Sequence, residues 1–268
     1  MPAFPAKRRS CVKKSVGRAA PDFCHGPTIP SLAPRFVETT AVLQARRRGA
    51  PVVIFDCNGV LVDSEQIAAA AAADEFARAG IPITPELVTR YFSGRRPADM
   101  LASVEAATGR KLPVNFSATL AAATLARLRA EVRAMPHAAH ALTWLRGPKC
   151  VASSSPPDRV RTSLETTGLA KFFNFLFSAS DVRNGKPAPD LFLHAAARMG
   201  VQAADCIVVE DSPAGVSAAT AAGMAALGFV GGSHAGAQLG EQLILAGART
   251  IVADLRHLKS AVVALRGW

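Results

Sequence analysis

The sequence lacks long apolar runs, paired cysteines and the biased composition of fibrous chains. Its longest strictly apolar run, residues 67–73, ends at Asp74, far short of the ~18 residues that a membrane span needs. Gly and Pro number only 20 and 18 of 268 residues, too few for a collagen-like or low-complexity chain. With half of its residues hydrophobic, the chain is also no coiled coil and not wholly disordered. We therefore expect a globular protein that does not partner a membrane.

The five cysteines are an odd number, and they are scattered without a CxxC pair. They are Cys11, Cys24, Cys57, Cys150 and Cys206. This pattern excludes a disulfide framework and a cysteine zinc site. A reducing compartment suits such a chain, so we predict a cytoplasmic protein.

Acidic residues are scarce at the amino-terminal end. Residues 1–50 contain ten Lys or Arg but only two acidic residues, whereas the other 218 residues contain 21 basic and 18 acidic ones. The formal charge of +11 therefore belongs mainly to a basic extension at 1–50, which we expect to be disordered. A transit peptide is less favoured, because six prolines interrupt any amphipathic helix there. Nucleic acid is an unlikely partner, since the extension carries no binding motif and the remainder is almost neutral.

Four short apolar segments predict a parallel sheet, because each is a continuous run typical of strands buried on both faces. These segments are 52–55, 150–152, 206–209 and 225–230. Helical patterns at 158–167 and 189–199 lie between them, and strands that alternate with helices imply an open α/β sheet. We expect a Rossmann-like, three-layer core with its ligand site beyond the carboxyl ends of the strands.

The roughly 85 residues between the first two strands have helical patterns interrupted by Gly and Pro. The expected helices are 65–79, 85–92, 98–108, 117–133 and 138–145. This segment is too long for an ordinary connection, so it predicts an all-helical cap domain inserted over the strand ends. The boundaries that follow are 1–50 for the extension, 51–64 and 147–268 for the core, and 65–146 for the cap.

Polar side chains follow the predicted strands and suggest a phosphate chemistry. Asp56 precedes a Gly turn whose backbone N–H groups can face an anion. Glu210 and Asp211 follow another strand, and carboxylates from neighbouring strand ends suit Mg²⁺. Ser153 ends a third strand and can donate to a phosphate oxygen, while Lys186 on a Gly/Pro loop can neutralise a phosphoryl group.

Taken in order, four segments resemble the motifs of the haloacid dehalogenase superfamily. They are FDCNGVLVDSE at 55–65, VASSS at 151–155, GKPAPD at 185–190 and VVEDSPAGV at 208–216. The resemblance spans about residues 51–230 and is closest to the branch of capped phosphatases and β-phosphoglucomutase-like enzymes. It implies a Mg²⁺-dependent phosphatase of a small phosphorylated metabolite, sugar-phosphate-like in kind.

By this resemblance, Asp56 is the nucleophile and forms an aspartyl-phosphate that water then hydrolyses. Mg²⁺ would be held by Asp56, Asp211 and the backbone carbonyl of Asn58, with Glu210 supporting it through water. The residues expected to bind the phosphoryl group are Ser153, Ser154 and Lys186.

The chain departs from the resemblance at Asn58. Phosphatases of the family have Asp at this position, which protonates the leaving oxygen and later deprotonates the attacking water. An amide carries no such proton, and losing a general acid/base costs about 10²–10⁴ in rate. Three explanations stay open: a replacement made to trap a bound state, a slow enzyme or one that favours good leaving groups such as acyl phosphates, and a relative that binds phosphorylated ligands without turning them over.

Three cap positions give information about the reaction and its substrate. Family mutases carry His twelve residues after the nucleophile, where this chain has Ala68, so a phosphatase is favoured over a phosphomutase. Arg95 and Arg96 follow Gly94 at a break between two cap helices. We expect them to bind the remote part of the substrate, the alternative being solvated side chains on the cap surface.

Overall fold

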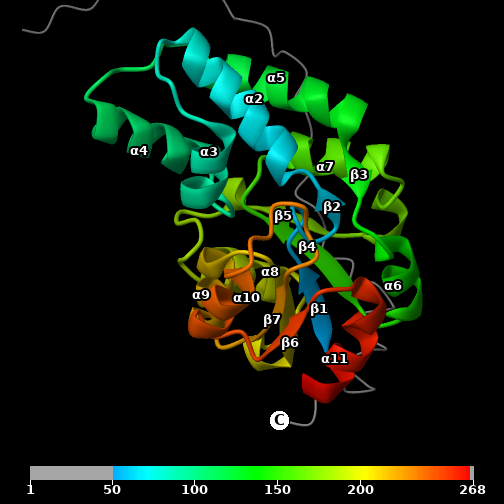
Figure 1. Ribbon diagram of the computed structural model, residues 1–268. Helices are drawn as coiled ribbons and strands as arrows, with labels where there is room; N and C mark the ends of the chain where they lie inside the picture. Colours follow the sequence, from blue (N-terminus) through cyan, green and yellow to red (C-terminus); the bar gives the residue numbers. More distant parts are fainter. Residues whose placement is uncertain (1–50, 266–268) are drawn as a thin grey trace, which may run out of the picture. The chain divides into compact units, whose positions relative to one another are not determined.

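Strand β1 (Val52–Phe55) lies inside a six-stranded parallel sheet in the computed structural model, which describes residues 51–265 (Figure 1). The strand order is β5 (Leu176–Ser178), β4 (Lys149–Ser153), β1, β6 (Cys206–Glu210), β7 (Ala225–Phe229) and β8 (Thr250–Val252). The four strands expected from the sequence are the adjacent strands β4, β1, β6 and β7. The expected basic extension, residues 1–50, lies outside the described residues.

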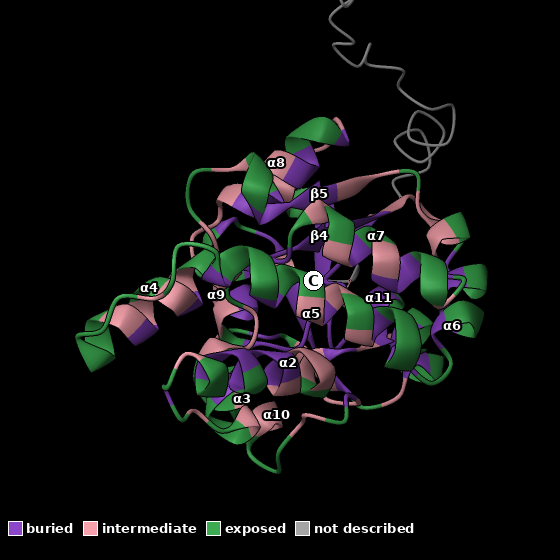
Figure 2. Cartoon of the chain, turned by 90° about the horizontal axis from the view of Figure 1, so that it is seen from above, coloured by how far each residue is buried: buried purple, intermediate pink, exposed green. Residues whose placement is uncertain are grey.

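The sheet is covered on both faces because β1 sends alternate side chains to opposite sides. Val53 and Phe55 pack with the first set of helices, and Val52 and Ile54 pack with the second. The first set is α6 (Ala138–Trp144), α7 (Pro157–Thr166) and α11 (Leu258–Leu265); the second is α8 (Asp190–Arg198), α9 (Pro213–Ala221) and α10 (Leu239–Leu245). Figure 2 shows the buried residues concentrated between these helices. The expected α/β, three-layer core is confirmed.

Four helices form a bundle above the carboxyl ends of the strands (Figure 1). They are α2 (Glu65–Arg78), α3 (Pro85–Phe92), α4 (Pro97–Thr108) and α5 (Phe116–Glu131). The bundle has its own apolar cluster, in which Phe76 is fully buried and its ring centroid lies 5.0 Å from that of Phe116. None of the helices within residues 51–265 is long and apolar enough to cross a membrane.

A two-stranded antiparallel ribbon joins the helical bundle to the sheet. It pairs β2 (Val62–Asp63) with β3 (Arg133–Ala134). The sequence predicted a helix that continued to Arg133, but α5 ends at Glu131 because Val132 adopts an extended backbone with ψ of 137°. The chain thus enters and leaves the bundle through neighbouring strands. Short 3₁₀ helices complete the fold at Ala170–Phe172, Ala179–Asp181, Ala203–Asp205 and Leu255–His257.

The packing of helix α6 indicates where the cap ends. The expected cap, 65–146, includes this helix, yet Ala138 and Leu142 belong to the same apolar cluster as Val53 and Phe55 of β1. Helix α6 also contacts α11 of the core. We therefore propose that the cap ends at the ribbon and that α6 belongs to the Rossmann-like core.

The apolar cluster of the bundle yields a stability prediction. Phe76→Ala should lower the free energy of unfolding by about 3–5 kcal/mol, because it leaves a cavity against Phe116. Leu87→Ala is the control, since Leu87 lies on the neighbouring helix α3 and is 42% exposed. Urea unfolding followed by circular dichroism measures both. Equal losses in the two variants would contradict the burial of Phe76 in the core of the bundle.

Candidate active site

Asp56 occupies the carboxyl end of the central strand, next to the end of β6. Its backbone N–H donates to the carbonyl of Val209 at 3.0 Å, which continues the β1–β6 ladder by one residue. Glu210 and Asp211 follow Val209, so the ladder delivers three carboxylates to one point. All three are buried, with exposures of 5%, 0% and 4%. Neighbouring strand ends therefore gather these residues as the sequence predicted.

Lys186 reaches the same point from the loop before α8. Its Nζ donates to Asp56 Oδ1 at 2.6 Å and also to Glu210 Oε1. The ammonium group is buried and lies over the ring of Phe192, 5.1 Å from its centroid. Burial lowers the pKa of Lys186, but the two carboxylates outweigh it, so the pKa is raised and the group stays charged.

Both carboxylate oxygens of Glu210 are engaged. Oε1 accepts from Lys186, and Oε2 accepts three hydrogen bonds of 2.9 Å, from the backbone N–H groups of Asp211 and Ser212 and from the Ser212 hydroxyl. We expected Glu210 to support a metal ion through water. Its contacts favour another role: Glu210 holds Lys186 and orients the backbone that presents Asp211.

Asp211 is a buried carboxylate that lies against His234. Among the described residues, its Oδ2 has no hydrogen-bond partner although it is buried, and His234 Nε2 lies 3.0 Å away without hydrogen-bond geometry. Burial raises the pKa of Asp211 to about 6. Gly59 is required beside it, because its φ is +79° and a Cβ there would overlap the Asp211 carboxylate.

The buried acids outnumber the cation at the strand ends. Burial raises the pKa of Asp56 to about 8; Lys186 opposes this rise, and the nearby Glu210 and Asp211 reinforce it. Within residues 51–265, no group of three or more His, Cys, Asp or Glu side chains is arranged to hold a metal ion. A hard cation would therefore rely on the carboxylates of Asp56 and Asp211 with backbone oxygen, and the buried negative charge and orphaned oxygen fit such an ion.

The amide of Asn58 is fixed by hydroxyl groups. Its Nδ2 donates to Ser155 Oγ at 2.8 Å and to Ser153 Oγ at 3.4 Å, while its Oδ1 accepts from Ser64 Oγ at 3.0 Å. Its backbone N–H donates to Asp56 Oδ2 at 2.9 Å. The side chain therefore stands beside the candidate nucleophile in one orientation, but it has no proton to exchange.

The three serines at the end of β4 differ in their contacts. Ser153, the last residue of β4, is fully buried and its Oγ accepts from Asn58 and from the Ser155 backbone. Ser154 instead donates to the carbonyl of Gly94 at 2.7 Å, so it links the core to the loop between α3 and α4. The role of Ser153 and Ser154 in phosphate binding stays a prediction.

A cavity of about 210 Å³ lies between these strand ends and the cap helices. Asp56, Asn58 and the serines of 153–155 line it on the core side. The cap contributes mainly apolar side chains: Ala68, Ala69, Ala72, Val88, Phe92, Met100, Leu120, Ala121 and Leu125.

Arg95 and Arg96 both line the cavity, but their contacts differ. Arg96 makes two hydrogen bonds of 2.8 and 2.9 Å to Asp99 and donates to the carbonyl of Arg183 at 3.1 Å, so it joins the cap to the core. Arg95 has a single contact of 3.3 Å, with Ser103 Oγ, besides its position over the Phe92 ring. Arg95 is thus the freer of the two cations to meet a substrate.

Three residues of the site were not predicted. Glu65, at the start of α2, and Arg159, in the first turn of α7, line the cavity and face each other at 3.4 Å. His234 follows β7 and contacts Asp211. Glu65 ends the first motif quoted above, and Arg159 follows the serine run closely, so both carried a signal. His234 carried none, because nothing near it in the sequence resembles a motif.

Comparisons with known proteins agree with this geometry. A family model described as haloacid dehalogenase-like hydrolase matches residues 50–223. The chain is 34% identical over 184 residues to 6-phosphogluconate phosphatase of Escherichia coli, a match that covers 68% of this chain and 83% of that protein.

Two solved structures share both fold and sequence. A conserved haloacid dehalogenase-like protein from Agrobacterium tumefaciens gives a TM-score of 0.69 at 35% identity, covering 81% of this chain and 99% of that one. A HAD family hydrolase from Deinococcus radiodurans, solved with bound phosphate and sodium, gives a TM-score of 0.63 at 30% identity. The match covers 81% of this chain and 96% of that one.

Packing around Glu210 yields a prediction. A Cβ at Gly215, in the first turn of α9, would overlap the Glu210 carboxylate. Gly215→Ala should therefore lower the free energy of unfolding by about 1–3 kcal/mol, even though Ala favours a helix. Gly236→Ala is the control, because a Cβ there meets nothing within 4 Å. Thermal and urea unfolding measure both; an unchanged Gly215→Ala variant would argue against the tight fit at Glu210.

Proposed function

The chain belongs to the haloacid dehalogenase-like hydrolases, and on this premise we propose that it is a Mg²⁺-dependent phosphatase of small phosphorylated metabolites that works slowly through an aspartyl-phosphate on Asp56. One observation carries the proposal. Asp56 lines the cavity on the core side, 2.6 Å from the buried ammonium of Lys186, and the neighbouring strand end presents Asp211, whose buried Oδ2 accepts no hydrogen bond among the described residues.

In the proposed reaction, a carboxylate oxygen of Asp56 attacks phosphorus and displaces the alcohol, and water then attacks the aspartyl-phosphate. Lys186 already faces Asp56, so it would neutralise the charge of the phosphoryl group as it arrives. Ser153 and the backbone N–H groups after β1 would bind phosphoryl oxygens. Mg²⁺, held by Asp56, Asp211 and the carbonyl of Asn58, would reduce the repulsion between the nucleophile and the phosphate.

Asn58 sets the expected rate. The position where family phosphatases have an acid holds an amide, and Ser64 and Ser155 fix that amide in place. We propose that turnover is slow for this reason and fastest with good leaving groups. The alternatives are a relative that binds phosphorylated ligands without turnover and, less favoured because of Ala68, a phosphomutase.

The relatives indicate the class of substrate. The E. coli relative is a 6-phosphogluconate phosphatase and the D. radiodurans structure holds phosphate. We propose a sugar-phosphate-like substrate, with the phosphate at the strand ends and the remainder under the cap. The cytoplasm remains our predicted location.

Replacing the amide tests the rate. Asn58→Asp should raise turnover of alkyl phosphate esters by about 10²–10⁴, because it restores a proton carrier next to Asp56. Asp56→Asn should abolish turnover in both backgrounds. A panel of phosphate esters with phosphate release as the readout measures these rates. Substantial native turnover that Asn58→Asp fails to improve would contradict the proposed handicap, and no turnover in either form would support the binding alternative.

Removing the metal tests the cofactor. Chelation by EDTA should abolish turnover, and added Mg²⁺ should restore it. Asp211→Asn should raise the Mg²⁺ concentration needed for half-maximal activity by at least about tenfold, since it replaces a carboxylate oxygen that accepts no hydrogen bond among the described residues. Asp254→Asn is the control, because the carboxylate of Asp254 is partly exposed and pairs with Arg256 away from the cavity. Activity that survives chelation would exclude a metal-dependent reaction.

A further inference from the structure

The reaction needs a proton carrier that Asn58 does not supply. A poor leaving oxygen must receive a proton, and the water that hydrolyses the aspartyl-phosphate must lose one. In the described part of the chain, three carboxylates line the cavity: Asp56, Glu65 and Asp158. Asp56 is the candidate nucleophile. Asp158 is 80% exposed at its side chain and lies 3.5 Å from Arg161, on the solvent side of α7. Glu65 is the carboxylate that remains.

Glu65 is held against the cavity by contacts from both cap and core. Its side chain is only 14% exposed. Oε2 accepts from Ser93 Oγ of the cap loop at 2.9 Å, and Oε1 faces Arg159 Nη2 of core helix α7 at 3.4 Å. Its charge also acts on Asp211 and His234, which places it within electrostatic reach of the strand ends.

The position of Glu65 is tied to that of Asn58. Ser64 directly precedes Glu65 and donates to Asn58 Oδ1 at 3.0 Å. Glu65 then begins α2 and lines the same cavity as Asn58. The Arg159 contact of 3.4 Å is long, and Arg159 Nε has no hydrogen-bond partner among the described residues, so a ligand that enters the cavity can take the place of Arg159 at Oε1 without breaking a short hydrogen bond.

We propose that Glu65 is the catalytic acid and base of this chain, carrying the proton that Asn58 cannot carry, but less effectively than an Asp at position 58 would; this proposal rests on the proposed phosphatase reaction. As Asp56 bonds to phosphorus and the bond to the leaving oxygen breaks, the Glu65 carboxyl group gives its proton to that oxygen. The resulting carboxylate takes a proton from the water that attacks the aspartyl-phosphate. This step releases inorganic phosphate, frees Asp56 and returns Glu65 to its starting form.

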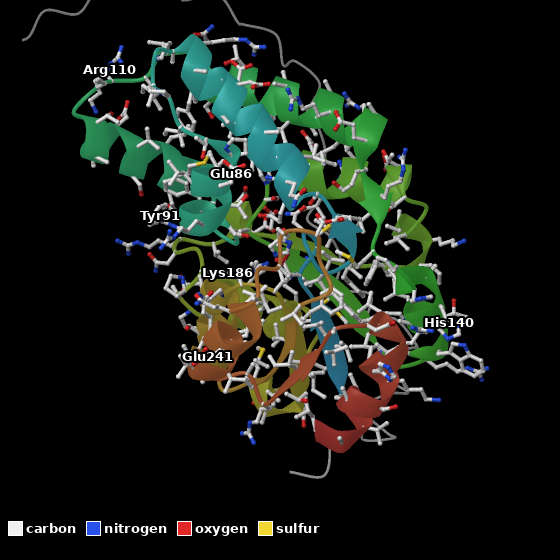
Figure 3. The ribbon with its side chains drawn as sticks, in the orientation of Figure 1. Glu86, Tyr91, Arg110, His140, Lys186 and Glu241 are labelled. Carbon is white, nitrogen blue, oxygen red and sulfur yellow. The ribbon has the colours of Figure 1, made fainter. Side chains whose placement is uncertain are left out.

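A double-mutant cycle tests the proposal. Glu65→Gln keeps the shape and removes the proton carrier, so in the native background it should lower turnover of an alkyl phosphate at least 100-fold. In the N58D background, a second carrier is present and the same change should cost less than about fivefold. Glu86→Gln is the matched control, because Glu86 is an exposed glutamate on α3 (Figure 3). Equal losses from Glu65→Gln in both backgrounds would overturn the proposal.

The kinetics with a good leaving group separate proton transfer from a structural role. p-Nitrophenyl phosphate needs no proton on its leaving oxygen, so E65Q should still form the aspartyl-phosphate and then hydrolyse it slowly. We expect a burst of about one nitrophenolate per active site, followed by a steady rate at least 100-fold below that of the native chain. A purely structural role would slow both steps and give no burst, which would overturn the proposal.

The outcomes also distinguish the failure of the Glu65 proposal from the failure of the proposed phosphatase function. If the native chain and N58D turn over and D56N does not, the phosphatase function stands, whatever Glu65→Gln does. If E65Q then matches the native chain on alkyl and nitrophenyl esters, the assignment of Glu65 alone is wrong. If neither the native chain nor N58D turns over any ester, the phosphatase function and the role of Glu65 fall together.

Discussion

The ammonium of Lys186, buried between the carboxylates of Asp56 and Glu210, is the contact on which the site depends. Placing carboxylates where water cannot reach them costs several kcal/mol per charge unless a partner is present. Lys186 offsets this cost for two of them, and Glu210 in turn binds the backbone of Asp211 and Ser212. The orientation of Asp211 therefore depends on Glu210, which does not line the cavity itself. One pairing thus fixes the nucleophile, the Asp211 carboxylate and the start of α9.

The cap covers the charged strand ends and forms one side of the cavity. The β2–β3 ribbon fixes where the cap helices leave the core, and the loop between α3 and α4 returns to it, where Gly94 accepts from Ser154 and Arg96 donates to the carbonyl of Arg183. A cavity that the cap covers in this way is partly shielded from water, which strengthens the electrostatic contacts within it. The charged groups that line the cavity are those of Asp56 at the strand end, those of Glu65, Asp158 and Arg159, and the cap cations Arg95 and Arg96.

The sequence predicted the parts of the fold that follow from local patterns. Strands β1, β4, β6 and β7 contain short continuous apolar runs, and their polar ends converge because parallel strands end at the same edge. Strands β5 and β8 have three residues each and lie at the edges, where half-buried positions give no clear run. The end of α5 depends on pairing between Asp63 and Arg133, and the packing of α6 depends on α11, which are contacts between distant segments. The same limit applies to the site: Glu210 was identified, but its engagement by Lys186 was not.

Asn58 and Glu65 show how a local substitution acquires its meaning from the fold. The sequence alone presents Asn58 as a loss, because an amide cannot exchange a proton. In the structure, three serines form hydrogen bonds with both ends of the Asn58 amide. The surrounding residues are therefore suited to an amide at this position. A carboxylate one residue beyond Ser64 then enters the same cavity from the start of α2. Proton transfer requires that the acid or base lie within hydrogen-bond distance of the reacting oxygen, and not that it occupy a particular position in the sequence. Glu65 can therefore take the proposed role of proton carrier that Asn58 cannot take.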